Sequence, residues 1–472
     1  MPTQIILKDK QLIKKYKNIL NVYNIKPKII IKTNSLIILE ITIDESTSAN
    51  KDLFVTLENS NKDDKIEIVH DNSPSKIPNT TIITGHRQKI KLAEFINLYF
   101  HDNEHLTELI KNHVSTKYTL YPPLILFNYS PVKQMFTSEL WESVLSNCHS
   151  NGVNRDSFFK KLIKNCFDDS IYTHIAINQP ILENDSKTNI NDNKNLWRKP
   201  LNIRPIYGSF WETEEYASNN SPELWKSPTE RDFTNAFWCH TVQNGIYQSW
   251  APFFTMFSRG NVKEKARILI TTKTAEGNNS YADIEGNDVV DMYCGIGYFT
   301  LSYLKRNCNR IFCFDLNPWS CEGLKRALLK NKFEKDDKKR CYIFNESNEY
   351  CLSELENYEK QFVNNIDTSR LRIRHINMGL LPTSEASWEL ALKIVAKHSY
   401  ELPIVTLHIH ENIHIDEIEG ENGFVKCKLL PKLKNYQVTI ENNFKVNVTH
   451  AEKIKTYAPD IWHVCIDVDI IK

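Results

Sequence analysis

From residue 288 onward, short apolar runs alternate with longer stretches in which apolar residues recur at helical spacing. The apolar runs read VVDMYC, RIFCFD, CYIFN, RLRIRHINM, ELPIVTLHIHE and IWHVCIDVDI, and they begin at residues 289, 310, 341, 370, 401 and 461. Strands that alternate with helices predict βαβ crossovers and a mostly parallel sheet with helices on both faces. The predicted fold class is therefore α/β, with a doubly wound, Rossmann-like C-terminal domain.

Two helix starts within this region are predicted from capping residues. Asn317 can cap a helix whose first position is Pro318, because proline fits a position that needs no N–H donor. Thr383 or Ser384 can cap a second helix after the segment LLP. The side chains predicted to face the core are Leu324, Ala327 and Leu328 in the first helix and Trp388, Leu392 and Val395 in the second.

The first 35 residues are strongly basic, with eight lysines against one aspartate. Their pattern predicts a strand over residues 4–8, a helix over residues 10–20 and a strand over residues 28–32. Two interpretations of the lysines stay open, a face that contacts RNA phosphates and a solvated helix face. At about 150 residues per domain, we expect smaller α+β domains over residues 1–120 and 121–270, followed by the Rossmann-like domain over residues 271–472.

Composition indicates a globular chain without an extreme charge. The 59 Lys and Arg residues nearly balance the 58 Asp and Glu residues, so a nucleic-acid surface has to be local. No segment approaches the roughly 20 apolar residues that span a bilayer, and the lysine-rich start lacks a secretory pattern, so we expect a cytoplasmic protein without a membrane partner. The 11 cysteines contain no CxxC pair, which favours reduced thiols over structural zinc or disulfides.

A glycine-rich turn is the most informative short motif. The strand ending at Asp291 runs into Gly295 and Gly297, and Asp315 stands 20 residues beyond the first glycine. This order suits a nucleoside ligand, with the distal carboxylate accepting hydrogen bonds from ribose hydroxyls. A dinucleotide prefers GxGxxG, whereas Thr300 occupies the third glycine position here. S-adenosylmethionine, which has no phosphate, fits better, and a glycine turn that binds nothing is the remaining alternative.

Several ordered blocks carry a resemblance to a known family. They span residues 242–269, 289–304, 315–331 and 455–468, and the similarity reaches back to residues 196–210. Together they resemble the family of tRNA guanine-N1 methyltransferases and wybutosine-synthesising aminocarboxypropyltransferases. The resemblance implies a class I methyltransferase domain, S-adenosylmethionine as a substrate and tRNA as the partner. It also implies that the middle region contributes to the cofactor and tRNA sites, and it makes residues 1–120 a candidate for tRNA binding.

One segment separates the two activities of this family. The methyltransferase branch is expected to carry an Asn-Pro-Pro-type motif after the fourth strand, whereas residues 377–385 read NMGLLPTSE. This departure resembles the wybutosine branch. It implies transfer of a 3-amino-3-carboxypropyl group to the tricyclic wybutosine precursor at the guanosine following the anticodon of phenylalanine tRNA, by a protein that we expect to be a monomer. Guanine-N1 methylation of the same nucleoside and a non-catalytic tRNA-binding module remain the alternatives.

The resemblance also implies cofactor contacts. The residues concerned are Ser258, Lys265, Asp315, Ser347 and Asn348. Ser347 departs from the family, whose members often have an acidic residue there. Asp315 suits the ribose, Asn348 the adenine edge and Lys265 the cofactor's carboxylate. A phosphate-facing surface is the alternative for the basic residues of this region, which are Arg259, Lys263, Lys265 and Arg267.

The transfer reaction itself needs no protein nucleophile, because a sulfonium already activates the neighbouring carbons. Rate is expected to come from alignment of the two substrates and exclusion of water. Ligands gather at the carboxyl edge of such sheets, and this position makes Asn377, Pro382, His410 and Asn412 candidates for the acceptor pocket. The segment NMGLLP is alternatively only a turn. We expect no metal site, because the histidines of LHIHENIHI lack cysteine or acidic partners on their face.

Overall fold

The computed structural model describes residues 2–7, 16, 20, 28–33, 36–42, 67–70, 89–100, 113–115, 117–130, 132–146, 154–178, 203–210, 222–270, 281–333, 339–361, 370–399, 401–418, 420 and 423–472. The chain divides into two compact units, Met1–His86 and Arg87–Lys472. The domain boundaries at residues 120 and 270 stay predictions.

The N-terminal unit contains a four-stranded sheet in the order β2-β3-β1-β4. Its strands are β1 (Pro2–Leu7), β2 (Lys28–Thr33), β3 (Leu36–Thr42) and β4 (Glu67–His70). The pairings β1–β3, β1–β4 and β2–β3 are all antiparallel. The two predicted strands are thus confirmed. Of the predicted helix only Tyr16 and Leu20 are described, both helical and buried, and its lysines lie outside the described residues.

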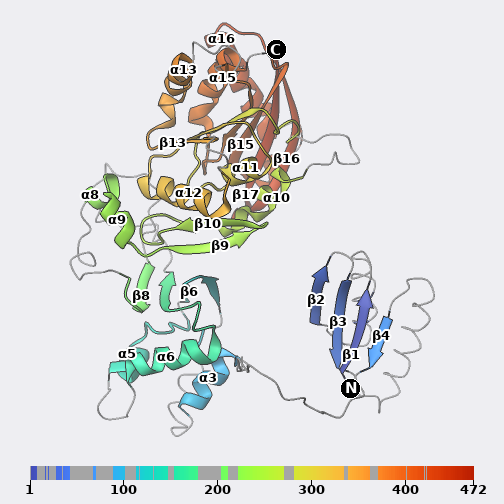
Figure 1. The fold of residues 1–472 in the computed structure, drawn as a ribbon. Helices are drawn as coiled ribbons and strands as arrows, with labels where there is room; N and C mark the ends of the chain where they lie inside the picture. Colours follow the sequence, from blue (N-terminus) through green and yellow to red (C-terminus); the bar gives the residue numbers. More distant parts are fainter. Residues whose placement is uncertain are drawn as a thin grey trace. The chain divides into compact units, whose positions relative to one another are not determined.

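The second unit begins with a small α+β layer (Figure 1). Its sheet has the order β5-β6-β7-β8 and consists of β5 (Tyr118–Tyr121), β6 (Leu124–Asn128), β7 (His174–Asn178) and β8 (Ile203–Tyr207). The helices that pack against it are α3 (Leu92–Tyr99), α5 (Glu139–Ser146) and α6 (Arg155–Cys166). Trp141, Phe158 and Phe159 are fully buried between sheet and helices, so this layer has an aromatic core of its own.

A connecting segment joins this layer to the C-terminal domain. Its elements are α8 (Pro222–Lys226), α9 (Glu230–Asn235), the hairpin β9 (Cys239–Gln243) with β10 (Ile246–Trp250), the 3₁₀ turn η1 (Arg259–Asn261) and α10 (Val262–Ile268). Trp250 of the hairpin packs in one cluster with Tyr121 and Leu124 of the small layer and with Ile296 of the glycine turn. The hairpin therefore ties the small layer to the predicted cofactor site.

The C-terminal domain is built on a seven-stranded sheet in the order β13-β12-β11-β14-β15-β17-β16 (Figure 1). The strands are β11 (Asp288–Asp291), β12 (Ile311–Phe314), β13 (Cys341–Phe344), β14 (Ile373–Met378), β15 (Ile404–His414), β16 (Lys445–Ala458) and β17 (Ile461–Ile471). The first five run parallel, and β17 and β16 pair antiparallel. β11 is the middle one of the five parallel strands, and the strand order reverses between β11 and β14, so its carboxyl end is a topological switch point, where open sheets bind ligands.

Helices cover both faces of this sheet, which confirms the doubly wound α/β prediction. One face packs against α13 (Cys351–Gln361), α15 (Trp388–His398) and α16 (Leu430–Thr439). The other face packs against α10, α11 (Thr300–Lys305) and α12 (Pro318–Asn331). All six predicted strands are present, as are the predicted core faces of the two helices.

The helix-cap predictions had different outcomes. The side chain of Asn317 accepts a hydrogen bond of 3.0 Å from the Trp319 backbone N–H, with Pro318 in the first turn, as predicted. The second prediction was confirmed for Thr383 and not for Ser384. The Thr383 hydroxyl accepts a hydrogen bond of 3.1 Å from the Glu385 backbone N–H, at the start of a 3₁₀ turn over residues 385–387 that leads into the α-helix at Trp388, whereas the Ser384 side chain makes no cap bond. The Ser384 hydroxyl instead donates to Glu411 on the neighbouring strand.

Two further expectations concern the whole chain. No helix within the described residues is long and apolar enough to cross a membrane. The ten cysteines of the described part are all free thiols, and most are buried, in agreement with the reduced state expected from the sequence.

Candidate functional site

The glycine turn lies directly after the central strand β11. Gly295 and Gly297 have φ values of +53° and +84°, a backbone region that side-chain-bearing residues avoid. A Cβ at Gly297 would lie 2.5 Å from Leu324 Cδ1, so this glycine also lets the turn pack against α12. The turn thus brings its backbone close to the carboxyl edge of the sheet.

Asp315 lies beside this turn at the end of β12. Its Oδ2 accepts a hydrogen bond of 2.9 Å from the Gly295 backbone N–H, and its Oδ1 accepts one of 2.9 Å from the Asn317 N–H. The side-chain amide of Asn345, after β13, donates to the Asp315 and Leu316 carbonyl oxygens at 2.9 and 3.0 Å. These bonds place the loops after three adjacent strands side by side.

Ser347 and Asn348 belong to the loop after β13. The Ser347 hydroxyl accepts a hydrogen bond of 3.3 Å from the Glu349 N–H and so caps the 3₁₀ turn η2 (Asn348–Tyr350). Glu346 precedes them, and its Oε1 is buried without a hydrogen-bond partner among the described residues. Burial, and then the charge of Glu354, raise the pKa of Glu346. An unpaired carboxylate oxygen at this edge is suited to an N–H donor such as an adenine amino group.

Ser258 reaches the glycine turn through Tyr298. The Ser258 backbone N–H donates to the Tyr298 hydroxyl at 3.0 Å, and that hydroxyl donates to the Met256 carbonyl oxygen at 2.5 Å. Lys455 of β16 donates to the Ser258 hydroxyl at 2.9 Å. The C-terminal hairpin therefore supplies a cation to the same site.

Lys265 of α10 is buried next to Tyr298. Its ammonium donates to the side-chain oxygens of Gln243 and Gln248 at 2.8 and 2.6 Å and lies 5.2 Å from the centre of the Tyr298 ring. Burial, and then the charge of Lys455, lower the pKa of Lys265 to about 7. Of the four basic residues of this region, Arg259 is exposed and the Lys263 side chain is largely exposed, whereas Lys265 and Arg267 are not. Of the two exposed residues, Lys263 forms an ion pair with Glu452, and Arg259 donates to the Thr119 hydroxyl at 3.2 Å.

Asp291 lies beneath the turn. It is fully buried and accepts hydrogen bonds from the Thr300 hydroxyl at 2.7 Å and from the Asn377 side-chain amide at 3.0 Å. Burial raises its pKa to about 7. These contacts connect β11, α11 and β14, so the carboxylate braces the turn from below.

The acceptor candidates are grouped at the carboxyl ends of β14 and β15. Oδ1 of Asn377 and Oδ1 of Asn412 are both buried and lack hydrogen-bond partners within the described residues. The segment between them is held by a bond of 2.8 Å from the Asn412 N–H to the Pro382 carbonyl oxygen. Strand β15 continues to His414 and so includes Asn412. Two unpaired amide oxygens beside an apolar loop suit a base that presents N–H groups.

His410 is placed deeper than the other acceptor candidates. It is fully buried, its ring stacks on Phe299 at 4.9 Å, and its Nδ1 lies 2.8 Å from His463 Nε2. Burial lowers the pKa of His410 to about 3, so its imidazole is neutral. His410 thus shapes the floor of this edge through Phe299.

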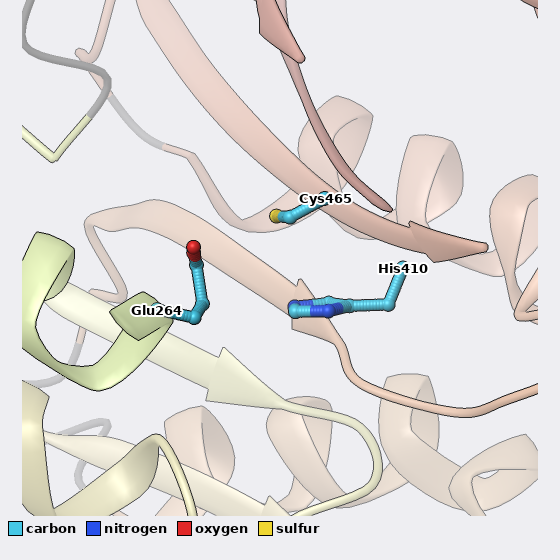
Figure 2. A group of neighbouring side chains, drawn as sticks. All are labelled: Glu264, His410 and Cys465. Carbon is cyan, nitrogen blue, oxygen red and sulfur yellow. The ribbon is translucent and has the colours of Figure 1, made fainter. Parts of the chain in front are cut away.

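His410 also belongs to a group with metal-ligand side chains. Its ligand atoms and those of Glu264 and Cys465 lie within 4.8 Å of one another and point inward from α10, β15 and β17 (Figure 2). However, the guanidinium of Arg267 binds both oxygens of Glu264, at 2.7 and 2.9 Å, and the Tyr281 hydroxyl donates to one of them. With its carboxylate already paired to a cation, this group is built as a polar core.

Sequence reasoning missed several residues of the site, namely Glu346, Tyr298, Lys455 and Glu411. Tyr298 follows the glycine motif directly, and its position there was the available signal. Lys455 reaches Ser258 across 197 residues of sequence, and nothing local to either residue indicates this contact.

Comparisons with known proteins show which family this chain is related to. The TRM5/TYW2 methyltransferase domain matches residues 242–340, a range that includes Ser258, Lys265 and the glycine turn. The chain is 36% identical to tRNA wybutosine-synthesizing protein 2 of Saccharomyces cerevisiae, over 100% of this chain and 98% of that protein. The chain belongs to the tRNA wybutosine-synthesizing protein 2 family.

A second member of the tRNA wybutosine-synthesizing protein 2 family, from Schizosaccharomyces pombe, is 30% identical over 83% of this chain and 80% of its own length. Among solved structures, P. horikoshii TYW2 in complex with MeSAdo has a TM-score of 0.47 and 16% identity, and the alignment covers 80% of this chain and 99% of that one. The two sequence relatives confirm the family resemblance expected from the sequence blocks, including the wybutosine branch.

Proposed function

We propose that this chain transfers the 3-amino-3-carboxypropyl group of S-adenosylmethionine to the wybutosine precursor in tRNA. The observation that carries this function is the relationship, over the full length, to a protein named for wybutosine synthesis. The C-terminal domain supports it, because a glycine turn followed by a carboxylate on the next strand suits an adenosine-containing ligand.

The cofactor-binding residues are those at the carboxyl edge of β11, β12 and β13. Asp315 binds the ribose, and Asn348, with Ser347 beside it, faces the adenine. Gly295 and Gly297 permit close approach, and Asp291 braces them. Ser258 and Lys265, which both contact Tyr298 next to the glycine turn, bind the amino-acid part of the ligand. S-adenosylmethionine supplies an activated γ-carbon in its methionine moiety.

The acceptor base lies at the adjacent edge, over β14 and β15. Asn377 and Asn412 offer unpaired amide oxygens to its N–H groups, and Pro382 contributes an apolar wall, with His410 beneath. A carbon of the base forms a bond to the methionine γ-carbon of S-adenosylmethionine. The bond between this γ-carbon and the sulfonium sulfur breaks, and methylthioadenosine leaves. The acceptor carbon then loses its proton. The chain's own groups align the two substrates and exclude water.

Isotope labelling tests the transferred group. The chain is incubated with phenylalanine tRNA that carries the tricyclic precursor and with S-adenosylmethionine labelled either in the methyl carbon or in the carboxypropyl carbons. We expect only the carboxypropyl label in RNA, with one methylthioadenosine released per label. Methyl label in RNA would establish guanine methylation instead. Retained tRNA affinity without any released methylthioadenosine would indicate a non-catalytic binding module.

The specific tRNA and the monomeric state are part of the same proposal. Unmodified tRNAs and tRNAs other than phenylalanine tRNA are expected to accept no label, and light scattering at assay concentration is expected to give the mass of one chain, 55.2 kDa. We further propose that residues 1–120 bind tRNA. Neutralising the lysines near the N-terminus together is expected to weaken tRNA binding and reduce its salt dependence. With fewer phosphate contacts, fewer counterions are released from the RNA on binding.

A further inference from the structure

A single carboxylate holds the segment that crosses the acceptor edge. We call residues 379–383, which follow β14, the acceptor loop. Glu411 Oε1 accepts hydrogen bonds from the Thr383 hydroxyl at 3.0 Å, the Ser384 N–H at 2.8 Å and the Ser384 hydroxyl at 3.1 Å. One oxygen atom therefore fixes the end of the acceptor loop through three donors.

The backbone next to Glu411 fixes the same loop a second time. Thr383 and Glu411 form an isolated antiparallel bridge, and the Asn412 N–H donates to the Pro382 carbonyl oxygen at 2.8 Å. Successive side chains of a strand leave on opposite faces. Glu411 thus holds the loop from one face of β15, while the Asn412 side chain leaves on the other.

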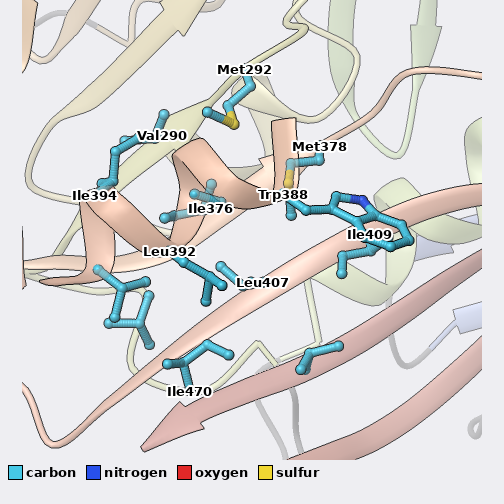
Figure 3. Packing of buried hydrophobic residues seen from close by; sticks show 14 of the residues in the cluster. Val290, Met292, Ile376, Met378, Trp388, Leu392, Ile394, Leu407, Ile409 and Ile470 are labelled. Atoms are coloured by element: carbon cyan, nitrogen blue, oxygen red, sulfur yellow. The ribbon is translucent and has the colours of Figure 1, made fainter. Parts of the chain in front are cut away.

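The far side of this clamp is anchored in the hydrophobic core. The Trp388 indole N–H donates to the Ser384 hydroxyl at 3.1 Å. Trp388 is fully buried, and it packs with Met378 and Ile409 in the core of the C-terminal domain (Figure 3). The loop end is therefore attached to the buried hydrophobic core of the domain.

We propose that Glu411 is a positioning residue that holds the acceptor loop in the conformation that receives the base. This inference rests on the proposed function. Glu411 itself is only 2% exposed, and its Oε1 accepts three hydrogen bonds from the end of the loop, so the structure places it in contact with the loop and the core. The loop it holds contributes apolar contacts from Leu380, Leu381 and Pro382, whose placement is set by the clamp.

Two substitutions at Glu411 separate positioning from chemistry. Glu411→Ala removes the shared acceptor, and a misplaced loop is expected to lower kcat/KM for tRNA on the order of 10- to 100-fold. The dissociation constant for S-adenosylmethionine is expected to stay at the wild-type value. Glu411→Gln keeps an amide oxygen at the position of Oε1 and is expected to restore most of the activity. Glu389→Ala, which removes a surface ion pair with Lys393, is the control and should behave as wild type.

Amide hydrogen exchange tests the clamp independently of activity. The Ser384 N–H is expected to exchange faster in Glu411→Ala than in wild type and at the wild-type rate in Glu411→Gln. If Glu411→Ala does not fold, Thr383→Val removes one donor at an exposed position and is expected to give a smaller loss in kcat/KM. Wild-type kinetics in the folded alanine variant, or equal impairment in the alanine and glutamine variants, would overturn the positioning role. An inactive wild-type chain with the expected exchange pattern would overturn the proposed function instead and leave the clamp standing.

Discussion

The carboxylate of Asp315 accepts a hydrogen bond from the backbone N–H of Gly295, at 2.9 Å. This contact joins the end of β12 to the turn after β11, so the two parts of the predicted cofactor site are connected before any ligand binds. The same carboxylate also accepts from the Asn317 N–H at the start of α12. Asp315 thus orders the turn and the start of α12, in addition to the ribose contact that we propose for it.

Removing Asp315 should therefore weaken cofactor binding. Asp315→Ala loses charge-assisted hydrogen bonds of about 1.5–3 kcal/mol, which corresponds to a roughly 10- to 100-fold rise in the dissociation constant. Calorimetric titration with S-adenosylmethionine measures this dissociation constant. Glu322→Ala, which removes an ion pair with Arg326 on α12, is the matched control. Unchanged affinity in Asp315→Ala would exclude Asp315 from the site.

Lys265 predicts a pH dependence of cofactor affinity. Its pKa of about 7 means that the ammonium is charged below neutral pH and loses its charge as the pH rises through 7. If this ammonium holds the cofactor's carboxylate, affinity should fall over the same range. Lys455→Gln removes the neighbouring charge that lowers this pKa, so the midpoint of the fall should move to higher pH.

The control for this prediction is Lys265→Met, in which the component of the pH profile due to the lysine should disappear while the ionisation of the cofactor's own amino group remains. Identical profiles in wild type and Lys265→Met, measured by calorimetry between pH 6 and 9, would show that Lys265 does not contact the carboxylate.

Asp291 predicts a pH dependence of stability. Burial raises its pKa from 3.8 to about 7, so the folded state holds a proton that the unfolded state releases at lower pH. The stabilisation from this proton is complete below pH 4 and is lost as the pH rises through 7, by ~4 kcal/mol in all. Asp291→Asn cannot ionise, so the difference in unfolding free energy between variant and wild type should change across this range. Urea denaturation at pH 4 and pH 8 measures this difference. The same difference in unfolding free energy between Asp291→Asn and wild type at both pH values would contradict a raised pKa.

The sequence was sufficient for the sheet and for part of the site, for identifiable physical reasons. Buried parallel strands are continuously apolar, as in the run that contains Ile311 and Phe314, and this signal is local. Strand β16 was not predicted, because only one of its residues is buried and its few apolar residues stand among three lysines and a glutamate. Gly295 and Asp315 were predicted because their chemistry depends on residues close in sequence.

Contacts between distant segments were beyond local pattern reasoning. In the sequence, Glu411 is the last residue of the apolar run ELPIVTLHIHE and is indistinguishable from a polar residue that ends a strand. Only the folded sheet places it against Thr383 and Ser384. The histidines of this strand are a second case. His408, His410 and His414 share one face of β15, as their spacing indicates, but only the folded sheet shows that the first two are fully buried, whereas His414 at the strand end is partly exposed.

The buried histidines His375 and His408 belong to one hydrogen-bond network. His375 Nε2 lies 2.8 Å from the Ala282 carbonyl oxygen, which only accepts, so this nitrogen carries hydrogen. Burial, and then the neighbouring His408, hold the pKa of His375 well below its usual value, and its Nδ1 lies 3.1 Å from His408 Nε2. His408 Nδ1 lies 2.8 Å from the Asp467 carboxylate. The network therefore connects β14, β15 and β17.

The partners of the buried carboxylates bear on metal binding at the neighbouring group of Glu264, His410 and Cys465. The Arg267 guanidinium pairs with the carboxylates of both Glu264 and Asp467, and His408 Nδ1 also contacts Asp467, so both carboxylates have partners without a metal ion. We therefore expect chelator treatment to leave the melting temperature unchanged. Stoichiometric bound metal whose removal lowers the melting temperature would contradict this expectation.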